Sequence, residues 1–545
     1  MKKIFNYLVL AITISVLSLI GCTKKIEESY LNPNAPTKVP VETILPSLIG
    51  NLTGSASAAG GGYGTGNDGL YIGRYVQFWA TNTTGNQFDQ MGGATGGSDL
   101  LGNVWAAHYY GMGANLSRMI EWAEDEKKWD YVGVGYALRA WSWLTLTNVH
   151  GEVIVYEAFN PSQRVFNYDD QVEVYKITRS LCHQALENLN KTGDGVSQPN
   201  LAKGDAYFYN GDVNKWKKFV YAVLARSFNQ LSNKPAEYKP DSVIYYANLA
   251  INANADNATV KFQYGSGTTN TGTANFFGPA RSNAGALRQT LFVSNLLTGL
   301  NSRFMGVSDP RVAYLIRENT NGTYKGIRPN KGSDGLSVAD QPRNFWGQSF
   351  ATTLAPALDT GGRYIFKNAV PLPVITASEV QFMKAEALYR KGDKGNALIA
   401  YVNGINLNFD LLQSTDYEQS VPAARRITPA SKAAYLASTV VVPVAADLTL
   451  SHIMLQKYIA LYGYGHIETW VDMRRFHYTD SEPGIPGQVY ADFTIPDLYL
   501  DNNGKVVYRA RPRYNSEYLY NITELSRIGA LALDYHTKEQ WFSMP

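Results

Sequence analysis

TASEVQFMKAEALYRKG, residues 376–392, is the stretch that decides the fold of this 545-residue chain. It opens on a Thr-x-x-Glu pattern, which is typical of a capping box at the start of a helix. Apolar residues then recur at helical spacing as far as Leu388, and Gly392 ends the run. A second helical segment follows from about 394 to 405. Two helices joined by so short a turn predict a hairpin of tetratricopeptide size.

The same spacing of apolar residues extends to both sides of this hairpin. Further helices are predicted at 131–149, at 172–190, in segments opened by Asp212 and by Pro240, from about 451, and after the interruption at Gly463 and Gly465. Amphipathic helices joined by short polar turns are typical of packed helical hairpins. The chain is therefore predicted to be mainly α-helical.

Helical periodicity is lost or weak in two regions: residues 50–69 are predicted to be a loop, and within residues 255 to about 370 the stretches 275–286, 319–340 and 358–363 are predicted to be long loops. Residues 50–69 are rich in Gly, Ser and Ala and contain a formal GxGxxG at 64–69. No apolar strand precedes that pattern in the sequence, which argues against a dinucleotide site. Residues 255 to about 370 are dense in Gly, Asn, Thr and Pro. Long loops within a compact protein are usually functional or disordered, and ligand specificity is expected in this variable region.

The first residues have the pattern of a bacterial lipoprotein signal. Lys2 and Lys3 give a positive start, and the apolar run at 8–20 is shorter than a membrane-spanning helix. The run ends at Gly21, where cleavage would leave Cys22 as an acylated N-terminus. We therefore expect a signal peptide at 1–21, a lipid tether that becomes a docked segment at 22–45, and a single domain at 46–545.

Composition narrows the classes of function. The 49 Lys and Arg against 46 Asp and Glu give a net charge of +3, so bulk electrostatics provide no reason to bind nucleic acid. With Cys22 acylated, Cys182 has no disulfide partner and is expected to be a buried packing residue. The 37 Tyr, 21 Phe and 10 Trp offer flat faces of the kind that sugar- and peptide-binding surfaces use, although large helical cores also contain such residues.

Five stretches, in order along the chain, are similar to motifs of the SusD/RagB family of nutrient-binding lipoproteins. They are ALRAW to GE at 137–152, GDVNKWKKF at 211–219, SEVQFMKAEA at 378–387, QKYIAL to ETWVDMRR at 456–475, and RPRYNSE at 511–517. Two positions depart from the family pattern, because Ile154 and Asn515 stand where the family has proline. Acidic residues, which in exported members often follow the cysteine directly, come here only at Glu27 and Glu28.

The charged residues of these motifs are interpreted as structural. Glu468, Asp472 and Arg475 share one helix face, where ion pairing between helix hairpins explains them better than acid–base catalysis does. Glu379 is expected to cap its helix, and Glu386 to pair with a base. The sequence has no His-Glu-x-x-His, no Gly-x-Ser-x-Gly, no P-loop and no histidines at metal-ligand spacing. We predict a protein without catalytic residues or cofactor, and no metal-ligating residues are assigned. A bound Ca²⁺ in an oxygen-rich loop stays open, as does a glycosidase, which needs only two carboxylates.

Candidates for ligand contact are aromatic, arginine and asparagine side chains in or beside the loops, because rings stack on sugar faces and polar groups bond hydroxyls. They are Tyr71, Arg74, Trp79 and Asn82, then Tyr324, Phe345 and Trp346 in the variable region, with Asn86, Gln87 and Arg343 as further ones. Trp346 is the strongest candidate for ligand contact, because a tryptophan in a Gly- and Asn-rich loop has no evident packing role. Alternatively, Trp79 belongs to the core together with its aromatic neighbours.

The resemblance implies a SusD-like fold of four tetratricopeptide-like helix pairs with extensive irregular loops. It also implies a SusC-like TonB-dependent transporter as partner and a glycan oligomer, sometimes a peptide, as ligand. We predict an outer-membrane nutrient-binding lipoprotein that faces the cell exterior and delivers its ligand to that transporter. The alternatives are a helical-repeat adaptor that binds proteins and a surface glycan hydrolase.

Overall fold

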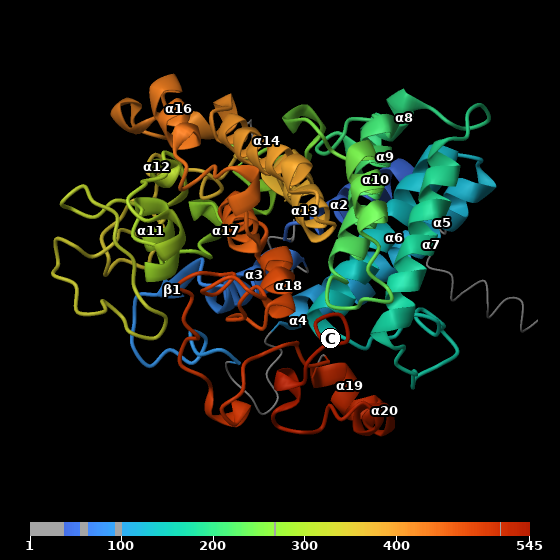
Figure 1. The fold of residues 1–545 in the computed structure, drawn as a ribbon. Coiled ribbons are helices and arrows are strands. Elements are labelled where there is room, and N and C mark those ends of the chain that lie inside the picture. Colours follow the sequence, from blue (N-terminus) through green and yellow to red (C-terminus); the bar gives the residue numbers. More distant parts are fainter. Residues whose placement is uncertain (1–37, 55–63, 93–100, 266–268, 513) are drawn as a thin grey trace, which may run out of the picture.

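The computed structural model describes residues 38–54, 64–92, 101–265, 269–512 and 514–545, which form helices joined by long loops (Figure 1). The helices are α2 Val41–Gly50, α3 Thr65–Tyr75, α4 Gly102–Ala106, α5 Ala114–Asp125, α6 Trp129–His150, α7 Gln171–Leu189, α8 Gln198–Asp205, α9 Val213–Asn229, α10 Pro240–Leu249, α11 Leu291–Thr298, α12 Val312–Leu315, α13 Ala377–Arg390, α14 Lys394–Leu412, α15 Thr415–Glu418, α16 Pro429–Ala437, α17 Leu450–Ala460, α18 His466–Arg475, α19 Tyr514–Tyr520 and α20 Ile522–Arg527. The strands are β1 Trp79–Thr81, β2 Ala258–Val260, β3 Leu287–Gln289 and β4 Leu372–Ile375.

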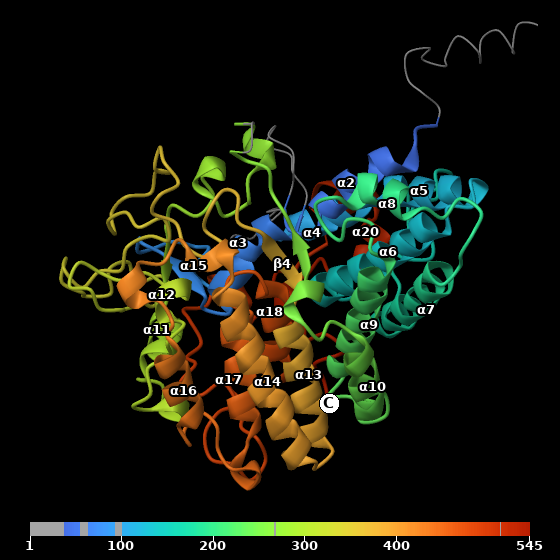
Figure 2. The same ribbon diagram turned by 90° about the horizontal axis from the view of Figure 1, so that it is seen from above.

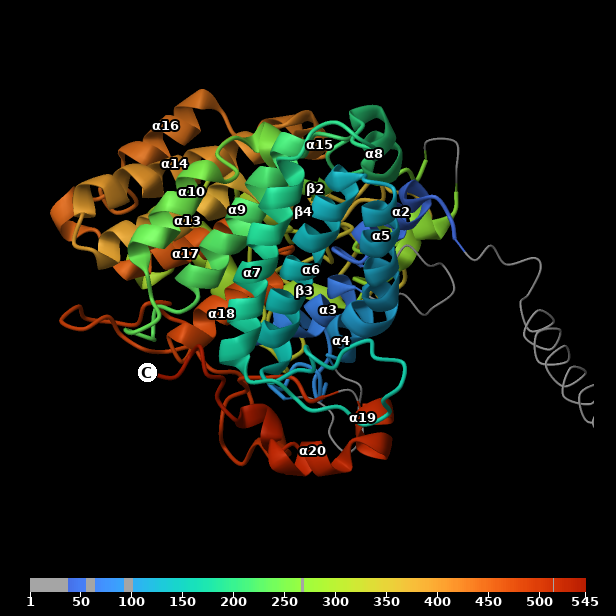
Figure 3. The ribbon, with the colours of Figure 1, turned by 90° about the vertical axis from the view of Figure 1, so that its right-hand side faces the viewer.

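The long helices pack as pairs in a row. Helices α6 and α7, α9 and α10, and α13 and α14 lie against one another, and contacts of α7 with α9 and of α10 with α13 join the pairs. Helix α17 packs on α13, and α18 packs on α6 and α3. Figures 2 and 3 show these helices side by side, and Figure 2 shows the loops around α11 and α12 beyond them. The predicted mainly helical architecture is confirmed.

Helix starts follow their capping residues. The Asp212 carboxylate accepts hydrogen bonds from the amides of Asn214 and Lys215 at 2.9 and 3.2 Å, as expected of an N-cap. At α13 the Thr376 hydroxyl accepts from the Glu379 amide at 3.3 Å, but the capping box is only half formed. The Glu379 carboxylate instead bonds the Arg226 guanidinium at 2.6 and 2.8 Å, because a buried cation is a stronger partner than a backbone amide.

The end of one predicted loop is helical. Helix α3 begins at Thr65, so residues 65–69 of the predicted loop are helical and that prediction is wrong. A Cβ on Gly66 would come within 2.7 Å of the Phe276 ring, and one on Gly69 within 2.4 Å of the His466 ring. These glycines therefore serve close packing of a helix, which their composition alone did not reveal.

Two apolar cores fill the molecule. One lies under the helix pairs α6–α7 and α9–α10, and it includes Cys182, which is fully buried as predicted. The other gathers aromatic and aliphatic side chains from α3, the loop region, α14, α17 and α18. Their boundary runs along α13, whose Met383 belongs to the first core and whose Phe382 belongs to the second.

Buried ion pairs tie the helices together at that boundary. The Arg475 guanidinium bonds Glu386 at 2.6 and 2.9 Å and Asp472 at 2.6 Å, and Lys457 lies 2.8 Å from Asp472. Burial raises the pKa of Glu386, but the cations of Arg475, Arg390 and Lys457 together outweigh it and hold that pKa far below its usual range. The predicted structural role of these charges is confirmed.

Short strands and one arginine position the loops. Strand β1 pairs with β3, and β2 pairs with β4, both antiparallel. Arg288 of β3 is fully buried and donates to the carbonyl oxygens of Ser349, Phe350 and Thr352, while its other Nη donates to Gly285 and Leu287. Burial among carbonyls lowers the pKa of Arg288 to about 9. The loop 349–352 is thus held through its main chain.

Candidate functional site

The leading aromatic candidates lie in the core. Trp346 is 2% exposed, and its indole N–H donates to the Phe277 carbonyl at 3.0 Å. Phe345 stacks on Phe366 with ring centroids 4.0 Å apart, and Trp79 is fully buried. The expectation that Trp346 stands exposed in its loop is wrong, because the loops fold over it and make it part of their core. The alternative interpretation of Trp79 as a core residue is confirmed.

Tyr71 and Arg74 come together on α3, where they form a cluster with Phe88 and Asp89. The Tyr71 and Phe88 rings meet edge to face with centroids 5.2 Å apart, and the Arg74 guanidinium lies 5.4 Å from the Tyr71 centroid. Arg74 is buried and faces Asp89 at 3.7 Å. Tyr71 remains half-buried, so contact of its ring with a ligand stays a prediction.

The remaining candidates mainly hold loops in place. Asn82 Nδ2 donates to the Phe350 carbonyl at 2.9 Å, and the Tyr324 hydroxyl accepts from Arg425 at 2.9 Å. Arg343 donates to the Gly347 carbonyl at 3.1 Å. Asn86 accepts from the amide of Phe88 at 2.9 Å, and Gln87 is exposed. These side chains fix the shape of the loops around a site more than they offer a binding surface.

A cleft of about 390 Å³ opens where three segments distant in sequence meet. The segments are Gln77, which follows α3, the stretch from α11 to Lys331, and residues 492–497; helices α3 and α11 are labelled in Figure 1. Gln77 Nε2 donates to the Thr494 carbonyl at 2.5 Å, and the Lys331 ammonium lies 2.6 Å from the Asp497 carboxylate. These two contacts join all three segments into one wall, which we call the polar cleft.

The polar cleft presents hydrogen-bonding groups with spare capacity. Asn295 on α11 is half-buried, and its side chain has no hydrogen bond to any residue that the structure describes. The Arg328 side chain is 59% exposed and donates to Asp334 from Nε and Nη2, while its Nη1 has no hydrogen bond to a described residue. Amide and guanidinium groups bind hydroxyl and carbonyl groups well. Phe292 and Ile495 add apolar surface.

Charge is balanced across the polar cleft. Arg328 and Lys331 face Asp492 and Asp497 among its lining residues. The hydrogen bond from Lys331 lowers the pKa of Asp497, so this carboxylate stays ionised at neutral pH. A wall with two charges of each sign favours a neutral, hydroxyl-rich ligand over a strongly charged one.

Backbone strain marks the same cleft. Gln77 has φ +58° and Asp492 has φ +66°, a left-handed conformation that is uncommon for glutamine. The Thr290 hydroxyl donates to the Gln77 carbonyl, and Asp492 accepts from the amide and hydroxyl of Ser302 at 2.6 and 2.7 Å. A strained backbone conformation persists only where neighbouring groups hold it, and such residues are common at binding sites.

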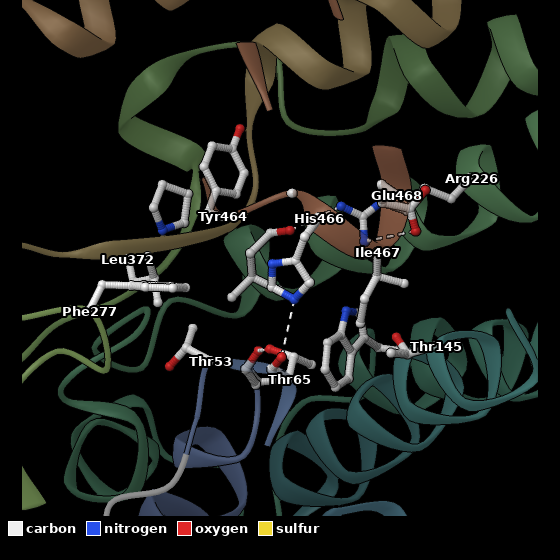
Figure 4. Close-up of a pocket in the computed structure, with 15 residues that line it drawn as sticks. Thr53, Thr65, Thr145, Arg226, Phe277, Leu372, Tyr464, His466, Ile467 and Glu468 are labelled. Carbon is white, nitrogen blue, oxygen red and sulfur yellow. Dashed lines mark hydrogen bonds and ion pairs between the residues drawn. The ribbon is translucent and has the colours of Figure 1, made fainter. Parts of the chain in front are cut away.

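A second, buried hollow lies between the two cores (Figure 4). It holds about 40 Å³ and is lined by polar groups that include Thr53, Thr65, Arg226, His466 and Glu468. The Thr53 hydroxyl and His466 Nδ1 have no hydrogen-bond partner among the described residues, and burial lowers the pKa of His466 to about 4. This volume suits water molecules and is too small for a nutrient.

Sequence reasoning missed Asn295, Arg328 and Asp492. The density of Gly and Asn pointed to the variable region that contains Asn295 and Arg328, but the residues singled out there were Tyr324, Phe345 and Trp346. No local pattern could bring Gln77 to Thr494, since they are 417 positions apart. In the part of the chain that the structure describes, no helix has the length and hydropathy to cross a bilayer, and no group of metal-ligating side chains gathers.

Comparisons with known proteins agree with this fold. Residues 33–496 match the model of a SusD-like family described as starch-binding and associating with the outer membrane. No curated protein sequence matches the chain.

Solved structures share the architecture. A SusD/RagB family protein from Bacteroides thetaiotaomicron has 19% identity and a TM-score of 0.66, with 93% of this chain and 99% of that chain covered. A SusD homologue from Bacteroides fragilis has 19% identity and a TM-score of 0.67, with 93% and 100% covered. A chitin-binding protein has 18% identity and a TM-score of 0.64, with 93% and 100% covered. At such identities the likeness shows the fold, and the predicted SusD-like fold is confirmed.

Proposed function

Because the chain belongs to the SusD-like family described as starch-binding and associating with the outer membrane, we propose that it is a surface lipoprotein that captures glycan oligomers in the polar cleft. The observation that carries the site is the cleft itself, with its balanced charges and the available groups of Asn295 and Arg328. A neutral oligosaccharide has many hydroxyl groups to bond and no net charge to neutralise. One structural neighbour is described as chitin-binding, which supports a glycan over a peptide.

Binding measurements with matched variants test this site. Calorimetry of the detergent-solubilised protein with malto- and chito-oligosaccharides and with a peptide digest is expected to give binding to one glycan series. Asn295→Ala and Arg328→Ala should each weaken that binding by about 1 to 2 kcal/mol, since each removes a hydrogen-bonding group. Arg118→Ala on α5 removes an exposed arginine far from the cleft and should leave affinity unchanged. Binding to the peptide digest alone would refute the glycan proposal.

We further propose that Cys22 carries the lipid anchor. Several acyl chains hold a protein on a membrane far more firmly than one does. Growth of cells with a labelled fatty acid should label the wild type, and Cys22→Ser should be unlabelled and appear in the soluble fraction. A Cys22→Ser protein that stays in the outer membrane would show that something else anchors it.

The proposed partner is a SusC-like TonB-dependent transporter, onto which the protein would deliver its ligand. Affinity purification of the lipid-anchored protein from its native membrane should bring down a large outer-membrane barrel protein. Purification of that barrel without this chain would contradict the complex. The same preparation, incubated with the oligosaccharides, should release no shorter products, whereas shortened glycans would indicate a hydrolase.

A further inference from the structure

A buried arginine without a partner lies in the variable region, two residues after helix α12 (Figure 1). Arg317 is 7% exposed, and its Nε and Nη1 atoms are buried without a hydrogen-bond partner. Its guanidinium makes no hydrogen bond or ion pair with any residue that the structure describes. Arg226, Arg311 and Arg475 are similarly buried, but each bonds a carboxylate. A buried charge that no described residue compensates is costly.

The charges around Arg317 add to this imbalance. Arg363 and Arg343 repel its guanidinium, and Glu318 attracts it. Both oxygens of Glu318 already accept hydrogen bonds from Arg363 at 2.8 Å. Burial, and then the charge of Arg363, lower the pKa of Arg317 to about 10, so Arg317 is still protonated at neutral pH. Three guanidinium groups therefore share one carboxylate.

Gly347 leaves space beside the Arg317 guanidinium. A Cβ at this position would come within 2.5 Å of Arg317 Nη2, and the φ of +84° also favours glycine. Arg343 Nη1 donates to the Gly347 carbonyl at 3.1 Å, and the other two nitrogens of Arg343 have no hydrogen bond to a described residue. Two guanidinium groups thus converge on one glycine. Gly347 and Arg343 are only half-buried, so this point lies near the surface.

The chemistry of these groups selects the kind of ligand. Guanidinium groups carry positive charge and only donors, arranged in a fork that matches the oxygens of a carboxylate or sulfate. Water or a sugar hydroxyl would accept their hydrogen bonds but would leave the charge uncompensated. An oxyanion supplies both the acceptors and the missing charge, and hydrogen bonds between charged partners are the stronger ones.

We propose that Arg317 and Arg343 form a site for one small oxyanion beside Gly347, either a free ion such as sulfate or the acid group of a uronate sugar. The polar cleft is lined by neither arginine, so the two sites are distinct. The oxyanion site does not depend on the glycan function proposed for the cleft. A bound oxyanion neutralises Arg317 and links the loop at 343–347 to the end of α12.

Equilibrium dialysis of the detergent-solubilised protein in Tris chloride tests this site with radiolabelled sulfate and, separately, with radiolabelled methyl glucuronide. The wild type should bind one oxyanion per chain. Arg317→Met and Arg343→Gln should each weaken this binding about tenfold or more, because each removes a charged donor. Arg118→Gln, which removes an exposed arginine on α5, is the matched control and should bind like the wild type.

Thermal melting gives a second readout. In buffer without oxyanions, Arg317→Met should melt at or above the temperature of the wild type, because it removes a buried charge that lacks a partner. Saturating oxyanion should raise the melting temperature of the wild type and leave that of Arg317→Met unchanged, because a ligand stabilises only the folded protein that binds it.

The outcomes separate the two sources of the oxyanion. Binding of methyl glucuronide that methyl glucoside does not displace shows that the site takes an acidic sugar, whereas binding of sulfate alone identifies a free ion. Absence of both ligands from the wild type overturns the site, as does undiminished binding in folded Arg317→Met or displacement by methyl glucoside. Melting of Arg317→Met below the wild type without oxyanions also overturns it, because Arg317 would then have a partner within the chain.

Discussion

Arg475 bonds two carboxylates on two helices while it is almost completely buried. Its Nη atoms reach Glu386 on α13 and Asp472 on its own helix α18. A buried ion pair of this kind adds little net stability compared with apolar packing, but removal of one partner leaves charge without compensation. The arginine therefore matters most as the residue that permits two acidic side chains to lie in the core.

Replacement of Arg475 by methionine should lower the free energy of unfolding by about 3 kcal/mol. This loss is near the lower limit of what removal of one partner from a buried ion pair costs. The reason is that Arg390 still contacts Glu386 and Lys457 still contacts Asp472. Urea denaturation followed by circular dichroism measures it. Lys176→Met breaks an exposed pair with Glu173 and should cost under about 1 kcal/mol. Equal losses in the two variants would refute the role given to burial.

His477 makes stability depend on pH. Partial burial lowers its pKa, but hydrogen bonds to Asp480 at 2.5 Å and Glu539 at 2.9 Å raise the pKa above its ordinary value of 6.5. Because the pKa is higher in the folded state, the stabilisation is complete below the unfolded value and is lost as pH rises through the folded value. The melting temperature of His477→Asn should fall below that of the wild type at about pH 5.5 and match it at about pH 9. A difference of the same size at both pH values would refute this titration.

At the scale of a helix, the start of α13 shows how tertiary partners redirect a local motif. Thr376 caps the helix as its sequence predicts, whereas Glu379 leaves the capping box for Arg226 of α9. The sequence contains the cap but not the position of Arg226, which lies 153 residues earlier in the chain. Half of the local prediction therefore holds, and the other half depends on how two helix pairs dock.

The two residues of this pattern should differ in their effect on stability. Thr376→Ala loses a single cap and should cost about 1 kcal/mol. Glu379→Gln leaves the buried Arg226 with Glu468 at 3.7 Å as its remaining carboxylate and should cost about 2 to 3 kcal/mol. Chemical denaturation of both variants measures which substitution lowers the free energy of unfolding more. A larger loss for Thr376→Ala would mean that the box, rather than the ion pair, holds the helix.

At the scale of the molecule, the sequence predicted the row of helices because helical periodicity is a local property. It did not predict which rings reach the surface. Trp346 stands in a loop rich in Gly and Asn, yet surrounding loops bury it, and Phe345 packs against Phe366. The polar cleft was missed for a related reason, because its walls come from segments that only the complete fold brings together.

Arg288 provides a test of how these loops keep their shape. Arg288→Met should loosen residues 349–352 by about 2 kcal/mol, because bonds from a charged donor to their carbonyls are lost. Hydrogen exchange measured by mass spectrometry should show roughly thirtyfold faster exchange in that segment and no change in α13 and α14. Arg343→Met, which removes one carbonyl bond, is the control. Unaltered exchange at 349–352 would show that Asn82 suffices to hold it.

Arg288 bonds main-chain carbonyl oxygens, so this contact does not depend on which side chains the loop carries. Arg288 would meet the same acceptors if Ser349, Thr352 or their neighbours were replaced in the course of evolution. Exposed positions of that loop, such as Leu354 at 78% exposure, can therefore mutate while the path of the chain is preserved. Homologues that differ at these positions would then still share the same scaffold beneath them.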